Sequence, residues 1–197
     1  AATAVGVVEA DAVLGPERVR AGDAVVAMAS SGFHSNGYSL VRRVVAAAGL
    51  DLHATPAGLA RPLGEELLEP TRIYAKACLD LAERTETHAM SHVTGGGLAA
   101  NLERVLPEEL SVRIDRSTWT PQPVFDVVRR VGDVAQADLE ATLNCGVGMV
   151  SLTAPGSVDT AISVLAGHGI RAWVAGEARA DDVDGGRVLL EGQHPGW

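Results

Sequence analysis

Short apolar runs alternate with segments of helical spacing along most of this 197-residue chain. Apolar residues that recur every three or four positions predict helices, and short runs rich in branched apolar residues predict strands. The predicted strands span 3–10, 24–29, 88–93, 111–114, 149–153, 171–175 and 187–191. The predicted helices span 41–48, about 70–82, 98–105, 123–131, 136–143 and 157–166. Because the two kinds of element are interspersed, the pattern predicts an α+β fold, a mixed β-sheet layered with α-helices, formed by residues 1–197 as one domain.

The stretch SSGFHSNGYSL, residues 30–40, joins the second predicted strand to a helix. Gly32 and Gly37 allow backbone bends and close approaches that a Cβ would block. We expect Ser35 or Asn36 to cap the helix, whose first N–H groups then face the loop. These N–H groups and the helix dipole both favour an anion. The turn therefore indicates either a phosphate site or, more plainly, a well-capped helix.

Two further glycine-bearing turns lie at strand–helix junctions. His92 leads into the run TGGG at 94–97, and the run NCGVG at 144–148 precedes a strand. The His92 imidazole can donate to a phosphate or transfer a proton, because its ordinary pKa is about 6.5. A strand-end histidine bonded only to backbone fits the local pattern equally well. Together the three turns indicate a site for a polar, phosphorylated molecule.

Other features narrow the functional class. Net charge is −9, which argues against non-specific nucleic-acid binding. No window has 18 or more apolar residues in succession, so a membrane span is not expected. The two cysteines have no metal or redox spacing, which favours a reduced, cytoplasmic setting.

Several site types do not fit the sequence. The chain has no P-loop lysine, no dinucleotide fingerprint and no nucleophile elbow. His88 and His92 lack the glutamate of a zinc helix, and the acidic run at 181–184 is typical of solvated loop charge. No metal site is therefore expected. Arg72 and Lys76 lie four apart on the helix predicted over 70–82, so we expect them to share a face. From there they can offer positive charge to an anion, although a solvated side chain is the plainer interpretation of Lys76.

Four blocks of sequence resemble phosphoribosylformylglycinamidine cyclo-ligase, also called aminoimidazole ribonucleotide synthetase. They are GDAVVAMASSGFHSNGYSLVR (22–42), LLEPTRIY (67–74), SHVTGGGLAANLERVLP (91–107) and TLNCGVGMV (142–150). The run AVGVVE (4–9) resembles the first strand of that family's C-terminal domain. The LLEPTRIY block separates this family from relatives of the same architecture, such as thiamine-monophosphate kinase. The resemblance covers nearly the whole chain.

The resemblance implies an ATP-dependent enzyme of purine biosynthesis that closes the imidazole ring of formylglycinamidine ribonucleotide. ATP phosphorylates the formamide oxygen, and the amidine nitrogen then displaces phosphate. ATP and magnesium are bound mainly by an N-terminal domain, which also carries most of the homodimer contact and has no counterpart in these residues. We therefore expect a C-terminal half without a cofactor of its own, which is inactive alone. The first residues, 1–3, lack a methionine and are read as a cut at a domain boundary.

The family's active site lies in the cleft between the two halves, and the matched motifs imply which residues line it. His34 and His92 are the implied catalytic residues, which stabilise developing charge or relay a proton. The implied substrate- and phosphate-binding residues are Ser31, Gly32, Ser35, Asn36, Thr94, Gly95 and Gly96. Phe33 departs from the family, which often has proline there, and Cys145 stands where methionine is usual.

Two other functions remain open at this stage. One is the glutamine-dependent formylglycinamidine ribonucleotide synthetase, which acts one step earlier and has a related domain. The other is a non-catalytic module that binds a phosphorylated ligand with the same fold. The sequence that precedes residue 1 in the native gene distinguishes these alternatives from the cyclo-ligase.

Overall fold

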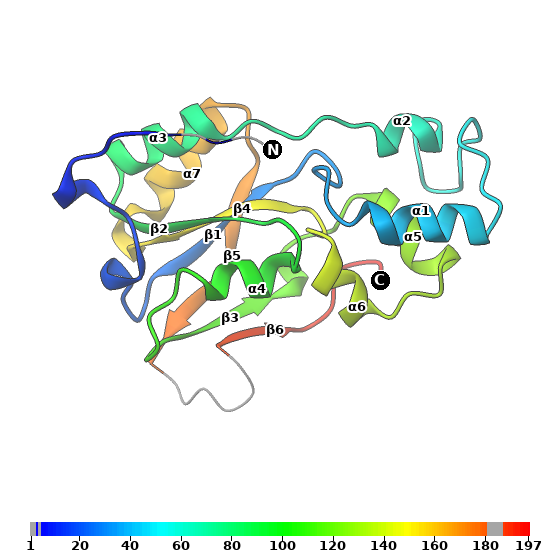
Figure 1. The fold of residues 1–197 in the computed structure, drawn as a ribbon. Helices are drawn as coiled ribbons and strands as arrows, with labels where there is room; N and C mark the ends of the chain where they lie inside the picture. Colours follow the sequence, from blue (N-terminus) through cyan, green and yellow to red (C-terminus); the bar gives the residue numbers. More distant parts are fainter. Residues whose placement is uncertain (1–2, 4, 181–186) are drawn as a thin grey trace.

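A single six-stranded sheet organises the molecule (Figure 1). The computed structural model describes residues 3, 5–180 and 187–197. Within them the strand order is β2-β4-β1-β5-β3-β6, and every neighbouring pair is antiparallel except β3 and β6. The strands are β1 (Ala24–Ala29), β2 (Thr87–His92), β3 (Ser111–Asp115), β4 (Val147–Thr153), β5 (Ala172–Arg179) and β6 (Val188–Glu191). The mixed sheet confirms the predicted fold class.

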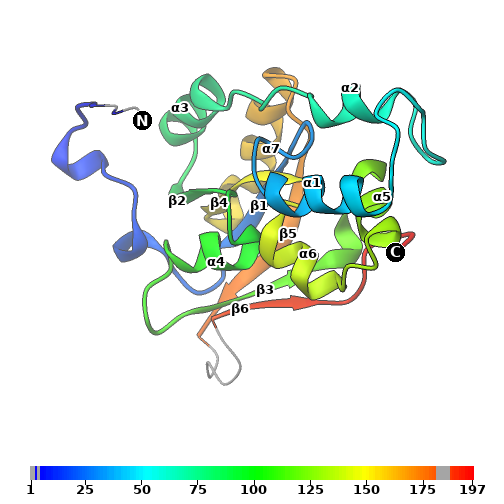
Figure 2. The same cartoon turned by 45° about the vertical axis from the view of Figure 1, so that its right-hand side comes forward.

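Helices cover both faces of the sheet and form a further layer beyond the ends of its strands (Figures 1 and 2). One face packs against α3 and α7, and the other packs against α4. The remaining α-helices, α1, α2, α5 and α6, share a separate apolar cluster around Phe33 and Phe125. The helices are α1 (Tyr38–Ala47), α2 (Leu63–Leu67), α3 (Ala75–Arg84), α4 (Gly97–Glu103), α5 (Pro123–Val131), α6 (Gln136–Thr142) and α7 (Val158–Gly167).

Strand β1 is apolar throughout because both faces of the sheet are covered where it lies. Val25 and Ala27 join the cluster beneath α4, whereas Val26 and Met28 join the cluster beneath α3 and α7. All four are fully buried. A strand buried on both faces reads as a continuous apolar run, and the run at 24–29 correctly predicted β1.

Strand direction brings the three glycine-bearing turns to one edge of the sheet. Strand β4 runs antiparallel to both β1 and β2, with Ala29 opposite Val147 and His92 opposite Met149. The end of β1, the start of β4 and the end of β2 therefore lie side by side. The first turn follows β1, the second follows β2 and the third precedes β4.

Two predictions of secondary structure were wrong, and one helix was not predicted. No strand forms over the described part of 3–10, whose residues are exposed and pair with no strand of the sheet. The helix predicted from residue 70 begins at Ala75, since residues 69–74 form an irregular segment held against the first turn. Helix α2 was not predicted from the sequence, and it begins at the buried Leu63.

Some sequence features lie outside the described residues or have no structural counterpart within them. The acidic run at 181–184 and the turn at 184–186 fall in the undescribed segment. Among the described residues no cluster of histidine, cysteine and carboxylate side chains is arranged to bind a metal ion. None of the helices in this part of the chain has the length and apolar character needed to cross a bilayer.

Candidate functional site

Hydrogen bonds tie the three turns into one structure, which we call the rim and define as residues 30–36, 92–97 and 144–148. The Ser30 N–H donates to the Gly146 carbonyl at 2.9 Å, which joins the first turn to the third. The Val93 N–H donates to the Gly148 carbonyl at 3.0 Å, which joins the second turn to the third. The predicted convergence of the turns at one edge is therefore present.

Asn144 is the buried centre of this arrangement. Its amide nitrogen donates to the Gly32 carbonyl at 2.8 Å, and its Oδ1 accepts from the Ser30 hydroxyl at 3.1 Å and the Gly146 N–H at 2.9 Å. The side chain is 1% exposed. Sequence reasoning identified the turn but gave Asn144 no role, because its partner Ser30 is 114 residues away. A buried amide whose nitrogen and oxygen are both hydrogen-bonded fixes the relative positions of two loops.

The first turn has an unusual backbone. His34 and Ser35 have φ values of 53° and 59°, a left-handed conformation that costs non-glycine residues energy. The helix cap is Gly37, with φ of 70° and no side-chain cap, so the expectation that Ser35 or Asn36 caps α1 was wrong. Asn36 instead donates to the His34 carbonyl at 2.7 Å and stabilises the bend.

His34 lies inside the turn, not on its surface. The residue is 3% exposed, and its Nε2 accepts from the Ser31 N–H at 2.9 Å. Burial, followed by the nearby charges of His92 and Arg72, lowers its pKa to about 4. Because Nε2 is the acceptor, the neutral ring carries its proton on Nδ1, which has no hydrogen-bond partner in the described structure. His34 thus acts on the rim as a neutral ring that holds Ser31.

The low pKa of His34 predicts a loss of stability in mild acid. An unfolded histidine is protonated below about pH 6.5, whereas the folded ring stays neutral down to about pH 4. The free energy of unfolding should therefore fall by about 2–3 kcal/mol between these values because of this residue. In His34→Asn, which tolerates the left-handed backbone, the fall should be smaller. Urea unfolding of both proteins at pH 7, 5.5 and 4.5 tests this. If the free energy of unfolding falls equally with pH in the wild type and in His34→Asn, the prediction is contradicted.

The segment 69–74, which we call the strap, crosses over the first turn. The Ser31 hydroxyl donates to the Pro70 carbonyl at 2.6 Å, and the Thr71 and Ser35 hydroxyls lie 3.4 Å apart. Arg72 donates from Nη1 to the Gly169 carbonyl at 3.2 Å, and its buried Nε has no partner in the described structure. Arg72 thus adds positive charge beside the rim.

Arg72 and Lys76 do not share a helix face, contrary to the sequence prediction. Arg72 lies in the strap, before α3 begins at Ala75, whereas Lys76 is an exposed residue of that helix.

The second turn depends on Asn101 of α4. This residue is 3% exposed and its amide nitrogen donates to the carbonyls of Thr94, Gly95 and Gly97, while the Thr94 hydroxyl donates to its Oδ1 at 3.1 Å. His92, by contrast, is exposed. Of the two implied catalytic histidines, only His92 is open to a ligand in this conformation.

The rim offers unused backbone donors. Within the described residues, a set of its N–H groups makes no hydrogen bond to protein. The set comprises Gly32, Phe33, His34 and Ser35 of the first turn, and Thr94, Gly95 and Gly96 of the second. Successive free N–H groups in turns of this kind form concave anion-binding sites. The arrangement is therefore suited chemically to a phosphate or another anion.

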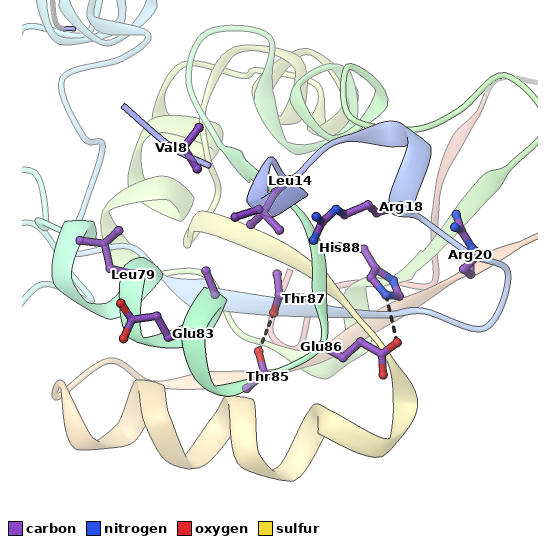
Figure 3. A pocket seen from close by; sticks show the side chains of 12 residues that line it. Val8, Leu14, Arg18, Arg20, Leu79, Glu83, Thr85, Glu86, Thr87 and His88 are labelled. Atoms are coloured by element: carbon purple, nitrogen blue, oxygen red, sulfur yellow. Dashed lines mark hydrogen bonds and ion pairs between the residues drawn. The ribbon is translucent and has the colours of Figure 1, made fainter. Parts of the chain in front are cut away.

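A cavity of about 560 Å³ lies elsewhere, at the opposite end of β2 (Figure 3). It is lined by the N-terminal segment, α3 and the start of β2, including Leu79 and His88. Its histidine is already engaged, since His88 Nδ1 lies 2.7 Å from Asp23 and Nε2 lies 3.5 Å from Glu86. The rim has N–H groups without a protein partner in the described structure, and we place the candidate site there on chemical grounds.

Comparison with known proteins assigns the class. Residues 20–188 match the family described as "AIR synthase related protein, C-terminal domain". The chain belongs to this family. In structure it is similar to thiamine-monophosphate kinase from Stenotrophomonas maltophilia, with a TM-score of 0.61 and 18% identity over 91% of this chain and 53% of that one. At this identity the likeness concerns the fold alone.

Relatives in sequence carry a more particular name. A Streptomyces fradiae protein named "Putative phosphoribosylformylglycinamidine cyclo-ligase" is 57% identical over 160 residues, covering 81% of this chain and 88% of that protein. The phosphoribosylformylglycinamidine cyclo-ligase of Symbiobacterium thermophilum is 45% identical over 192 residues, covering 95% of this chain and 54% of its own length. The chain thus spans about half the length of the second relative.

Proposed function

We propose that this chain is the C-terminal half of an ATP-dependent cyclo-ligase, which converts formylglycinamidine ribonucleotide to aminoimidazole ribonucleotide in de novo purine biosynthesis. The observation that carries the proposal is the match to cyclo-ligases along 95% of the chain at 45% identity, across all three turns of the rim. The rim supports it with free N–H groups suited to a sugar phosphate or a transferred phosphoryl group.

Residues 1–197 then act as a single C-terminal domain within a longer enzyme. The Symbiobacterium relative is about twice as long as the matched region, which leaves room for an N-terminal half that binds ATP and magnesium. The homodimer and most nucleotide contacts belong to the other half in this proposal.

The structure suggests different roles for the two histidines. His92 is exposed beside the free N–H groups of Thr94, Gly95 and Gly96, where an imidazole donor can stabilise charge on a phosphorylated intermediate. His34 is buried and bonded to Ser31, so its contribution is to hold the first turn, together with Ser35 and Asn36. The N–H of Gly32, a buried residue of the same turn, has no protein partner in the described structure and is a further donor in this proposal. Arg72 in the strap adds a permanent positive charge nearby.

The isolated chain should not turn over substrate. Incubated with ATP, magnesium and formylglycinamidine ribonucleotide, it should release no phosphate above background, because the residues that activate ATP lie in the other half. The complete protein, in which the N-terminal half encoded by the native gene precedes this chain, should turn over substrate. The assay follows phosphate release and formation of aminoimidazole ribonucleotide. Substantial product formation by the isolated chain would contradict the proposal that ATP is activated by the other half. Absence of product from the folded complete protein would contradict the proposed cyclo-ligase activity.

A further inference from the structure

The segment that follows β6 turns back toward α5 and α6 (Figures 1 and 2). It contains a buried histidine, His194. His194 is 2% exposed and makes edge-to-face contacts with Trp119 and Trp197, at centroid distances of 4.5 and 4.7 Å. Its Nδ1 lies 3.2 Å from the Arg116 carbonyl and its Nε2 lies 3.2 Å from Oε1 of Glu140. A polar residue is thus the anchor of the C-terminal tail.

Glu140 of α6 is the centre of this anchor. Its carboxylate is 8% exposed and accepts two hydrogen bonds from Arg116, both at 2.8 Å, and one from Gln136 at 2.9 Å. Burial alone would raise its pKa, but bonds from His194, Arg116 and Gln136 lower it to about 2. We call Arg116, Glu140 and His194 the C-terminal latch. A buried carboxylate that accepts this many hydrogen bonds holds its partners in one geometry.

The latch and its neighbour Trp119 contact the rim at two places, Cys145 of the third turn and Gly97 of the second. Trp119, which packs on His194, donates from Nε1 to the Cys145 carbonyl at 2.9 Å, and Cys145 has a left-handed φ of 44°. The Glu140 backbone carbonyl packs directly against Gly97, so closely that a Cβ on Gly97 would overlap it. The third turn and the second turn are therefore both braced by residues of the latch or their immediate neighbour.

We propose that His194 and Glu140 are positioning residues for the rim: the C-terminal latch holds the second and third turns in the geometry that binds a phosphate group, without touching the ligand. This inference rests on the proposed anion site for its functional consequence, although the bracing itself is a separate property. Loss of the latch should loosen the turns first, because Cys145 is a non-glycine residue in a left-handed backbone conformation that its surroundings must maintain, and because Gly97 would lose the backbone packed against it.

The test compares three variants of this chain. His194→Ala removes the anchor, and His194→Gln keeps a donor for Glu140. Val164→Ala removes buried volume in α7, on the opposite face of the sheet, and serves as the control for lost stability. Amide hydrogen exchange reports on the rim through Gly97 and Val147, whose N–H groups bond to Thr94 and Asn144.

In His194→Ala, protection of the Gly97 and Val147 amides should drop at least about tenfold beyond the change in global unfolding, with partial recovery in His194→Gln. Val164→Ala should change these amides only as far as global stability changes. If the Gly97 and Val147 amides of His194→Ala lose only as much protection as the change in global stability explains, as in Val164→Ala, the proposal is overturned.

A titration with inorganic phosphate, followed by the amide shifts of Gly95 and Gly96, adds the functional readout. His194→Ala should bind phosphate about five- to tenfold more weakly than wild type, whereas Val164→Ala should match wild type. If wild type, His194→Ala and Val164→Ala bind phosphate with equal affinity, the positioning role is overturned. If wild type itself shows no response, the proposed anion site fails, while the exchange data still decide whether the latch braces the turns.

Discussion

Replacing Gly97 by alanine should unfold the second turn and cost on the order of 3–5 kcal/mol of stability. Gly97 has φ of 70°, and an added Cβ would overlap the Glu140 carbonyl and approach the Leu143 carbonyl at 3.4 Å. These atoms belong to the backbone at the end of α6 and cannot move aside as a flexible side chain would. Urea denaturation at neutral pH should show a strongly lowered midpoint or no folded baseline.

Gly95→Ala is the matched control, two residues earlier in the same turn. Its Cβ would meet nothing within 4 Å, and its φ lies outside the left-handed range. We expect a change of at most about 0.5–1 kcal/mol in the free energy of unfolding. Similar losses in the two variants would show that the contact between α4 and α6 does not set the geometry of the rim.

In the complete enzyme that we propose, replacing His92 by alanine should lower kcat about 10²- to 10³-fold, with a smaller change in KM. The proposed reason is that His92, exposed at the end of β2, donates to charge that develops on the phosphorylated intermediate. Because that charge is absent in the ground state, the loss should appear mainly in kcat. The measurement is steady-state phosphate release over a range of substrate concentrations.

His53→Ala provides the control. His53 is exposed in the loop between α1 and α2, and among the described residues its one hydrogen bond is made by its backbone N–H. Its kinetic constants should match those of wild type. Thermal unfolding of the His92 variant should also be unchanged, because an exposed side chain contributes little packing. Full turnover in a folded His92→Ala enzyme would remove the residue from the proposed chemistry.

Local patterns predicted some elements far better than others. Helix α5 was predicted at its observed bounds, 123–131, because Pro123 suits a first helical turn and the apolar spacing is regular. The run at 3–10 has the same apolar character as β1 but forms no strand in its described part, since a strand needs a neighbour and none of the described strands pairs with it. A helix was predicted from about residue 70, yet the strap is irregular and its Pro70 carbonyl accepts a hydrogen bond from Ser31 of the first turn.

Some features of the candidate site were likewise predictable from the sequence, and others were not. Small residues, hydroxyls and glycines at three strand–helix junctions were visible along the chain, and they correctly indicated which loops meet. The burial of His34, the central place of Asn144 and the bracing by Glu140 were not visible. Each depends on partners that are distant in sequence or on a neighbouring backbone, and one-dimensional spacing carries no information about such contacts.

The sequence alone determined the class of fold, the positions of the three turns and the resemblance to a cyclo-ligase, because periodicity, glycine placement and motif order are properties of the chain itself. Tertiary structure decided that β1, β2 and β4 bring those turns to a single edge, and that one histidine is sealed and neutral while the other faces solvent. The physical reason is that exposure, pKa and donor availability depend on what packs around a group, and only the folded chain supplies those neighbours.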